Sequence, residues 1–348
     1  MKERVPDAAS ERDLDQLRSE ASAGGPISRE GIRPAGAPFP RPSAETGYYG
    51  LPALKEPTWT WEVPIYFFVG GAAGACAALS AAARWTGADA RLVRRARWIA
   101  AAGAALSPPL LISDLGRPER FLNMLRVAKI RSPMSVGAWT LVAFSTSASA
   151  AAFADLLDRR LGGSVPVRVV ADAAGALSAV TGLGMATYTG VLLGATAIPA
   201  WYENASVLPA HFAASALGSA VGLLELSGRS DPALNALGLA AAAAEIVVGA
   251  SLESRRGRSL EPLKTGRAGA FIRAGGLLSG PIAFLLRSFG GRNIAMRRVA
   301  GVAAVTGSMC TRIGWVAAGH ASARDPIPVL NAGSDAAVSR EPHSEPPG

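Results

Sequence analysis

The sequence predicts an all-α fold, a polytopic membrane bundle of eight transmembrane helices behind a disordered N-terminal tail. Of its 348 residues, 49% are hydrophobic and only 18% are charged. The apolar residues gather into stretches of roughly 20, the length that spans a bilayer. The first 60 residues differ: they hold eight Lys or Arg, nine Asp or Glu and no apolar run, so they cannot bury a core.

The predicted membrane domain covers residues 46–322, between disordered tails at 1–45 and 323–348. Its spans are rich in Ala, Gly, Leu and Val, and small residues let helices pack closely in lipid. Five tryptophans mark span ends, where an indole ring prefers the headgroup level: Trp59, Trp61, Trp85, Trp98 and Trp201. The expected spans are about 62–84, 97–115, 135–157, 167–194, 206–226, 232–252, 268–289 and 297–320.

The charges favour a membrane protein over a nucleic-acid-binding one. Residues 61–320 carry 25 basic and 13 acidic side chains, spread between the hydrophobic segments rather than gathered on one patch. Loop charges balance too closely to fix the orientation by the positive-inside rule. The N-terminus alternates acidic and basic residues and does not read as a cleavable signal peptide. Two cysteines, Cys76 and Cys310, are too few to ligate an Fe–S cluster.

The end of the second span, LSPPLLISDLGRPERFLNML, combines a helix break with a charge. Pro108 and Pro109 lack the backbone donor, which predicts a kink and free carbonyls near Ser113 and Asp114. A carboxylate at that depth needs a partner or a water-lined pocket, and Arg117 is the nearest candidate. The alternative is that the prolines only shape the bundle and Asp114 caps a helix.

The segment after this span predicts a short helix lying in the membrane interface. Apolar Phe121, Leu122, Leu125 and Val127 alternate with basic side chains, which suits such a helix. We expect the basic side chains to dock a partner, although they could equally bind lipid headgroups. They are Arg117, Arg120, Arg126 and Lys129.

Eight spans bring several polar residues to one interface, because odd helices start and even helices end on the N-terminal side. The residues are Glu62, Tyr66, Asp114, Tyr188 and His211. Polar groups at one depth of a hydrophobic bundle indicate a site. Each also has a simpler interpretation: Glu62 favours a helix N-terminus, Tyr188 suits the aromatic belt, and a lone histidine is often a structural donor.

Two charged residues lie deep in later spans. Glu245 and Arg312 would be costly unpaired, so they are expected to pair across the sixth and eighth spans. A proton path is the functional interpretation, and a static ion pair is the other. Asp172 and Glu225 lie toward the opposite face, where they would open such a path or cap helices.

Four ordered motifs resemble the NrfD/PsrC family of polysulphide reductase membrane subunits. They are YYGLPALKEPTWTWEVPIYFFVGGAAGA at 48–75, LSPPLLISDLGRPERFLNMLRV, SPMSVGAW, and TYTGVLLGATAIPAWYEN followed by LPAHF. The resemblance covers about residues 47–215 well. It implies eight transmembrane helices with no haem or Fe–S cluster in this chain, in the bacterial cytoplasmic membrane.

The resemblance also implies a role. Such subunits pass electrons between a membrane quinone, menaquinone or ubiquinone, and a four-cluster ferredoxin-like Fe–S subunit, usually with a molybdopterin catalytic subunit. They are not active alone. Tyr188 matches a tyrosine that hydrogen-bonds the quinone, and Glu62 is the most plausible polar partner on the first span. Some relatives use Asn and His there, whereas this chain offers Glu62 and Tyr66.

Three other functions stay open. A secondary transporter would use the midplane charges Glu245, Arg273 and Arg312, although no internal repeat supports it. A proton-translocating module would lack direct quinone chemistry. A cytochrome b type anchor needs two axial histidines, and only His211 and His320 lie in the membrane domain.

Overall fold

The computed structural model describes residues 54–117, 119–228, 231–255 and 257–325. The predicted disordered tail at 1–45 lies outside these ranges, as does the one at 323–348 except for its first three residues, where helix α13 continues to Arg324. The described residues form helices and connecting segments, with no strand among them. The long helices are α2 Glu62–Trp85, α3 Ala90–Asp114, α5 Pro133–Arg160, α6 Val165–Gly194, α8 Leu208–Leu226, α9 Pro232–Ser254 and α13 Ile294–Arg324. A further long element joins α11 Gly266–Leu277, the π-helical turn η3 Leu278–Ile282 and α12 Ala283–Gly290, and the short helices are α4 Glu119–Leu125, α7 Pro199–Tyr202 and α10 Glu261–Lys264.

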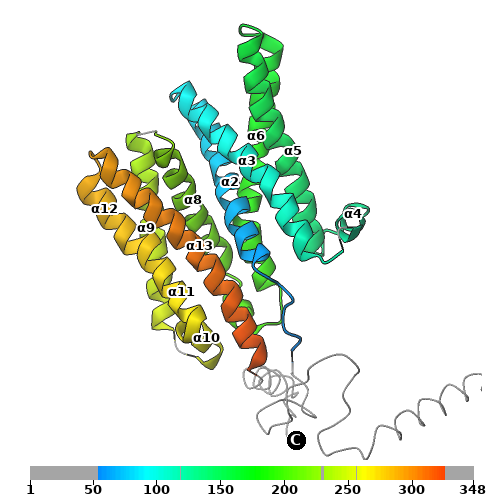
Figure 1. Ribbon diagram of the computed structural model, residues 1–348, viewed down its shortest axis with the longest axis vertical. Helices are drawn as coiled ribbons and strands as arrows, with labels where there is room; N and C mark the ends of the chain where they lie inside the picture. Colours follow the sequence, from blue (N-terminus) through cyan, green and yellow to red (C-terminus); the bar gives the residue numbers. More distant parts are fainter. Residues whose placement is uncertain (1–53, 118, 229–230, 256, 326–348) are drawn as a thin grey trace, which may run out of the picture. The chain divides into compact units, whose positions relative to one another are not determined.

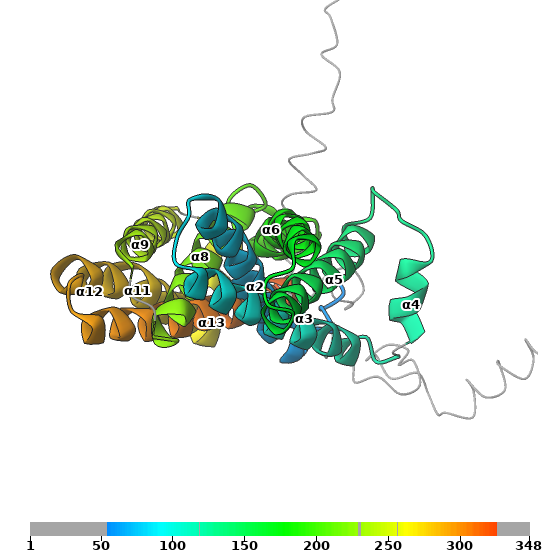
Figure 2. The same cartoon turned by 90° about the horizontal axis from the view of Figure 1, so that it is seen from above.

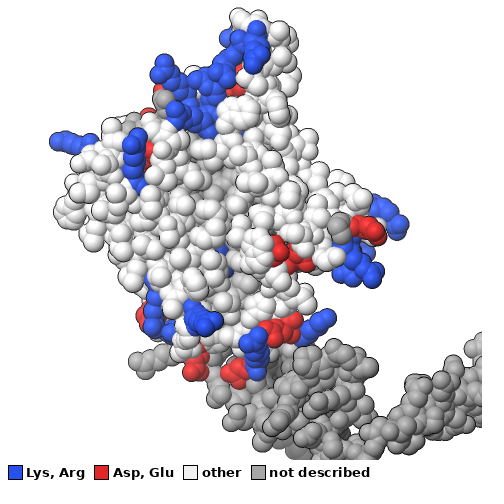
Figure 3. Space-filling view, viewed as in Figure 1, with Lys and Arg blue, Asp and Glu red and all other residues white. Residues whose placement is uncertain are grey.

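The helices have the length and composition of a multi-pass membrane protein. Six of those described are long and apolar enough to cross a bilayer: α2, α5, α6, α9, the joined Gly266–Gly290 and α13. The number becomes seven if the bent pair of α3 and α4 is one span. Charged side chains gather at the helix ends and around α4, with a broad uncharged belt between them on the face in view (Figure 3).

Local sequence explains where the helices begin. Asp89, Asp231 and Asn293 each accept a hydrogen bond from the backbone N–H two residues later, which caps α3, α9 and α13. Proline stands in the first turn of α5, α6, α8 and α9, where its missing N–H costs nothing. These ends lie within a few residues of the expected ones, except that α3 begins seven residues early, at Ala90.

The long helices alternate in direction and pack in two groups (Figures 1 and 2). α2, α3, α5 and α6 form one group, and α8, α9, α11–α12 and α13 form the other. The groups meet where α2 and α6 contact α8 and where α2 contacts α13. Glycines allow the closest approaches, because Gly74 meets Gly182 and Gly222 meets Gly301 with no room for a Cβ. Two adjoining bundles therefore place the polar residues described below.

The prolines of α3 do not interrupt the helix, which stays continuous from Ala90 to Asp114. Pro108 cannot donate to the carbonyl of Ala104, and Ser145 of α5 donates to that carbonyl at 3.0 Å instead. A neighbouring helix thus satisfies one of the carbonyls that the two prolines leave without an intrahelical donor. The sharp bend comes later, where α4 turns 112° from α3.

One expected interfacial tryptophan lies in the interior. Trp201 is fully buried, and its indole N–H donates to the carbonyl of Trp315 at 2.8 Å. Trp59 stacks on it, with ring centroids 5.1 Å apart. These contacts tie the chain before α2 and the short helix α7 to α13, so Trp201 is not part of an aromatic belt.

Candidate functional site

The two carboxyls at one end of the first bundle meet at Thr60. Its backbone N–H donates to Oδ1 of Asp114 at 3.2 Å, and its hydroxyl contacts both Asp114 and Glu62. Glu62 opens α2 and Asp114 closes α3, so the antiparallel packing of these helices brings the carboxyls together. Asp114 is half-buried and, among the described residues, forms no ion pair with Arg117, so the expected neutralisation by that arginine is not observed.

A pair of buried tyrosines lies deeper on the same side. Tyr66 follows Glu62 by one helical turn and is 2% exposed, while Tyr188 of α6 is 8% exposed. The two are close enough to interact electrostatically. The hydroxyl of Tyr188 donates to the carbonyl of Pro133 at 2.5 Å, and its ring packs where Gly137 leaves room. Because Pro133 begins α5, Tyr188 and Asp114 lie at the same end of the bundle.

The basic segment stands beside this end. α4 turns away from α3 and lies at the outer edge of the first bundle, beyond α5 (Figure 2). Its Phe121 is buried against the core, whereas Leu122 is 69% exposed. This arrangement suits an amphipathic segment at the interface. The four basic side chains expected to dock a partner, Arg117, Arg120, Arg126 and Lys129, are all exposed.

His211 does not join the tyrosines. Its Nε2 lies 3.2 Å from Oε2 of Glu245, and both side chains are at least 95% buried. Ser279 donates to the same carboxylate oxygen at 3.1 Å. Ser279 belongs to the π-helical turn, where Pro281 has no N–H for an α-helical ladder. Three elements of the second bundle, α8, α9 and η3, therefore converge on Glu245.

Arg312 lies next to this cluster but does not contact Glu245 directly. Its Nη1 donates to the hydroxyls of Ser215 at 2.5 Å and Ser308 at 2.9 Å, and its Nη2 donates to the carbonyl of Phe212 at 3.0 Å. The guanidinium also covers the ring of Phe212, 4.6 Å from its centroid. The expected ion pair between Glu245 and Arg312 is thus replaced by an imidazole on one side and hydroxyls on the other.

These residues belong to a buried polar stripe along α8. His211, Ser215 and Ser219 are spaced by four residues, which places them along one face of α8, and the buried Glu225 follows six residues later near the end of the helix. Ser215 donates to Ser308 of α13 at 2.9 Å. The serines are not among the residues that the sequence analysis singles out, although their helical spacing from His211 is a signal that finds them.

Glu225 ends the stripe in a fully buried ion-pair cluster. Arg287 of α12 forms two hydrogen bonds to it, at 3.0 and 2.8 Å, and Nε of Arg297 of α13 adds a third at 2.8 Å. All three side chains are at least 95% buried. The sequence places Arg287 and Arg297 next to predicted loops, and nothing in their local pattern indicates burial.

Asp172 lies elsewhere, between α2, α3 and α6. It accepts hydrogen bonds from Arg84 at 3.0 and 2.8 Å and from Arg97 at 3.0 Å. Arg97 is 4% exposed and also pairs with Asp155 at 2.7 Å. Asp172 therefore belongs to a separate ion-pair network of the first bundle, and the four expected proton-path residues do not form one chain of contacts.

One protein-family model matches the chain. It is described as polysulphide reductase, NrfD, and it covers residues 52–229, about half of the chain. The matched region contains Glu62, Tyr66, Asp114, Tyr188 and His211, whereas Glu245 and Arg312 lie beyond it. No curated protein matches the chain.

Proposed function

Because the chain belongs to the polysulphide reductase NrfD family, we propose that it is the quinone-interacting membrane anchor of a multi-subunit oxidoreductase. It passes electrons between menaquinone or ubiquinone, an exchangeable ligand, and an Fe–S partner subunit of the four-cluster ferredoxin type. A catalytic subunit of molybdopterin type completes the complex. The chain itself carries neither haem nor Fe–S cluster, and the complex lies in the bacterial cytoplasmic membrane, with eight crossings.

One structural observation carries the proposal: Glu62 and Asp114 meet at Thr60, one helical turn from the Tyr66 and Tyr188 pair. A quinone carbonyl accepts a hydrogen bond, which a phenol donates, and a hydroquinone hydroxyl donates one, which a carboxylate accepts. The exposed basic segment beside this end suits docking of the Fe–S subunit. A site near that face keeps the electron route short.

We assign the eighth crossing to α8. This helix has 19 residues, and α2, α6, α9 and α13 all pack against it. Its polar stripe lowers its apolarity, and a helix buried among others does not need an apolar surface on every side. We therefore count α8 as a span, together with α3, in addition to the six that meet the criterion of length and composition.

Proton transfer is the second part of the proposal. The stripe of His211, Ser215, Ser219 and Glu225 gives the second bundle a row of buried polar groups, of which Ser219 donates to the carbonyl of Ser215 and Ser215 donates to Ser308. Its two ends are Glu245 and the Glu225 cluster. The same stripe favours the rival function, a proton-translocating module without direct quinone chemistry.

The histidines favour an anchor without haem. His211 is engaged by Glu245, and His320 contacts Glu56 and the carbonyl of Trp59, both at 3.1 Å. The two imidazoles therefore lie in different clusters of contacts. They do not face each other as the two axial ligands of one haem would.

Purification of the complex tests the proposal. An affinity tag on this chain should recover an Fe–S subunit, and the purified complex should reduce or oxidise a short-chain quinone. A chain that comes out alone and transports a solute in liposomes would overturn it. A complex that transports protons but neither reduces nor oxidises quinone would favour the proton-translocating module.

A further inference from the structure

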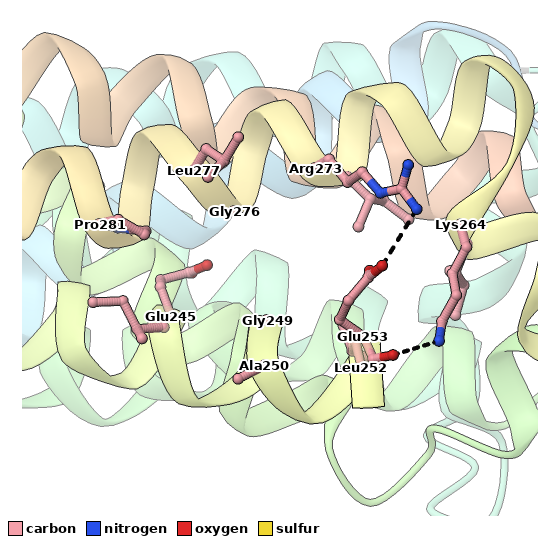
Figure 4. Close-up of a pocket in the computed structure, with 13 residues that line it drawn as sticks. Glu245, Gly249, Ala250, Leu252, Glu253, Lys264, Arg273, Gly276, Leu277 and Pro281 are labelled. Carbon is pink, nitrogen blue, oxygen red and sulfur yellow. Dashed lines mark hydrogen bonds and ion pairs between the residues drawn. The ribbon is translucent and has the colours of Figure 1, made fainter. Parts of the chain in front are cut away.

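A cavity of about 400 Å³ lies between α9 and α11, outside the region matched by the family model. Figure 4 shows it bounded by the two helices, with charged side chains toward the loop end and Glu245 toward the π-helical turn. Aliphatic side chains and glycines make up most of its walls. This volume falls in the range of small-molecule sites.

Glu245 forms the inner end of the cavity and has an unused acceptor. Figure 4 shows its carboxylate pointing into the space between the helices. Oε2 contacts His211 and Ser279, whereas Oε1 is buried and has no hydrogen-bond partner among the described residues. Buried polar atoms are nearly always hydrogen-bonded. An occupant of the cavity that donates a hydrogen bond would satisfy Oε1.

The charges at the other end do not call for a charged occupant. The ammonium of Lys264 donates to the carbonyls of Glu253 at 2.7 Å and Arg255 at 2.5 Å. Arg273 pairs with the carboxylate of Glu253 at 3.3 Å. Both cations that line the cavity already have partners, so a neutral molecule suits it better than an anionic headgroup.

The glycines of the cavity are not needed for helix packing. A Cβ on Gly249 or Gly276 would meet nothing within 4 Å, in contrast to Gly74 and Gly182, whose backbones touch. Gly249 and Gly276 therefore widen the space between α9 and α11 and make room for a flat ring. The cavity is closed at the π-helical turn, where Gly280 packs against Ile246.

We propose that this cavity binds the hydroquinone form of the membrane quinone, with a ring hydroxyl donating to Oε1 of Glu245 and the tail leaving between α9 and α11 into lipid. The inference rests on the proposed function and names a second place, apart from Tyr188, where its substrate binds. A lipid acyl chain would pack against the apolar walls of the cavity, but it would leave Oε1 of Glu245 without a hydrogen bond. A hydroquinone is neutral, apolar along its body and a donor at its tip, and so meets all three conditions.

Photolabelling tests the inference on the purified complex. A short-tailed hydroquinone that carries a diazirine should label peptides of α9 and α11, and excess unlabelled hydroquinone should prevent this. Gly276→Leu, or Gly249→Leu if the first variant does not assemble, should lower the labelling about tenfold by filling the cavity. Glu245→Gln should lower it severalfold, because an amide is a weaker acceptor than a carboxylate. Val247→Leu, on the exposed face of α9, should leave it unchanged.

Three outcomes would overturn the inference. An alkyl diazirine without a hydroxyl that labels α9 and α11 equally well would identify a lipid cavity. Label on the peptides of Tyr66 and Tyr188 alone would exclude this cavity while leaving the proposed function intact. Quinone turnover is measured on the same preparation, and its absence together with the absence of label would remove the proposed function as well.

Discussion

The imidazole of His211 contacts the carboxylate of Glu245 across 3.2 Å, linking α8 to α9 inside the second bundle. The histidine lies within the region matched by the family model and the glutamate beyond it. Both side chains are at least 95% buried, and the contact gives each of them a polar partner in place of water. The contact therefore joins a helix of the family region to the part of the chain that the match does not reach.

Replacing Glu245 by Gln tests whether this carboxyl handles protons. The amide keeps the size of the side chain, but it cannot take up and return a proton. We expect quinone turnover to fall by roughly a hundredfold, the lower end of what a positioned acid or base contributes. The measurement is hydroquinone oxidation by the purified complex, together with proton release in liposomes. Glu261→Gln, on an exposed residue of α10, is the control and should retain full turnover.

Replacing Tyr188 by Phe tests the quinone contact in the first bundle. The variant loses the hydrogen bond to the carbonyl of Pro133, worth about 1 kcal/mol of stability. We expect the phenol to exchange this acceptor for the quinone carbonyl when quinone binds, so the variant should raise the Michaelis constant for quinone by about tenfold. The measurement is steady-state quinone reduction. Tyr202→Phe removes a hydroxyl from a residue that is 66% exposed and should change neither quantity.

Replacing Glu225 by Gln tests the buried ion-pair cluster. The change removes the carboxylate that forms two hydrogen bonds with the buried Arg287, which costs about 3–5 kcal/mol. The midpoint of thermal unfolding in detergent should fall steeply. Glu253→Gln breaks an exposed pair with Arg273 and should cost less than about 1 kcal/mol. If the unfolding midpoints of the two variants fall equally, burial does not determine how much each ion pair contributes to stability.

Much of the fold follows from the sequence, because a membrane span needs a long apolar run and its ends attract proline and capping residues. The first helix is expected at 62–84 and observed at Glu62–Trp85. That Glu62 and Asp114 lie at the same end of the bundle follows from the alternation of spans. The side chain between them, Thr60, is not predictable in this way, because it depends on the path of the chain before α2.

The buried ionic contacts could not be read from the sequence. Arg97 and Arg287 stand near span ends, where arginine usually reaches water, yet both are at most 4% exposed. Their partners, Asp172 and Glu225, lie on other helices, and only the packing decides which charges meet. Glu245 illustrates the same limit. The apolar sequence around it indicates that it is buried, but not that His211 faces it.

Reversing charges on the segment around α4 tests the docking surface. Arg120→Glu combined with Arg126→Glu should weaken binding of the Fe–S subunit, because both side chains are exposed beside the end that holds Asp114. Added salt should weaken the wild-type complex in the same direction. Co-purification at low and high ionic strength measures both effects. Arg91→Glu, an exposed arginine at the start of α3 and so at the opposite end, should leave the complex intact.

Acidification should release the segment before α2. Arg324 donates hydrogen bonds to both oxygens of Glu56 and, with His320, holds the pKa of that carboxyl below its usual value of 4.5. A lowered pKa means that the contact stabilises the fold fully above the usual value and loses this contribution as the pH falls through the lowered one. Fluorescence of Trp59, which stacks on Trp201, should report the release at acid pH. Glu56→Gln should show the released signal already at neutral pH and no such acid transition, whereas a transition that persists in the variant would assign the release to another group.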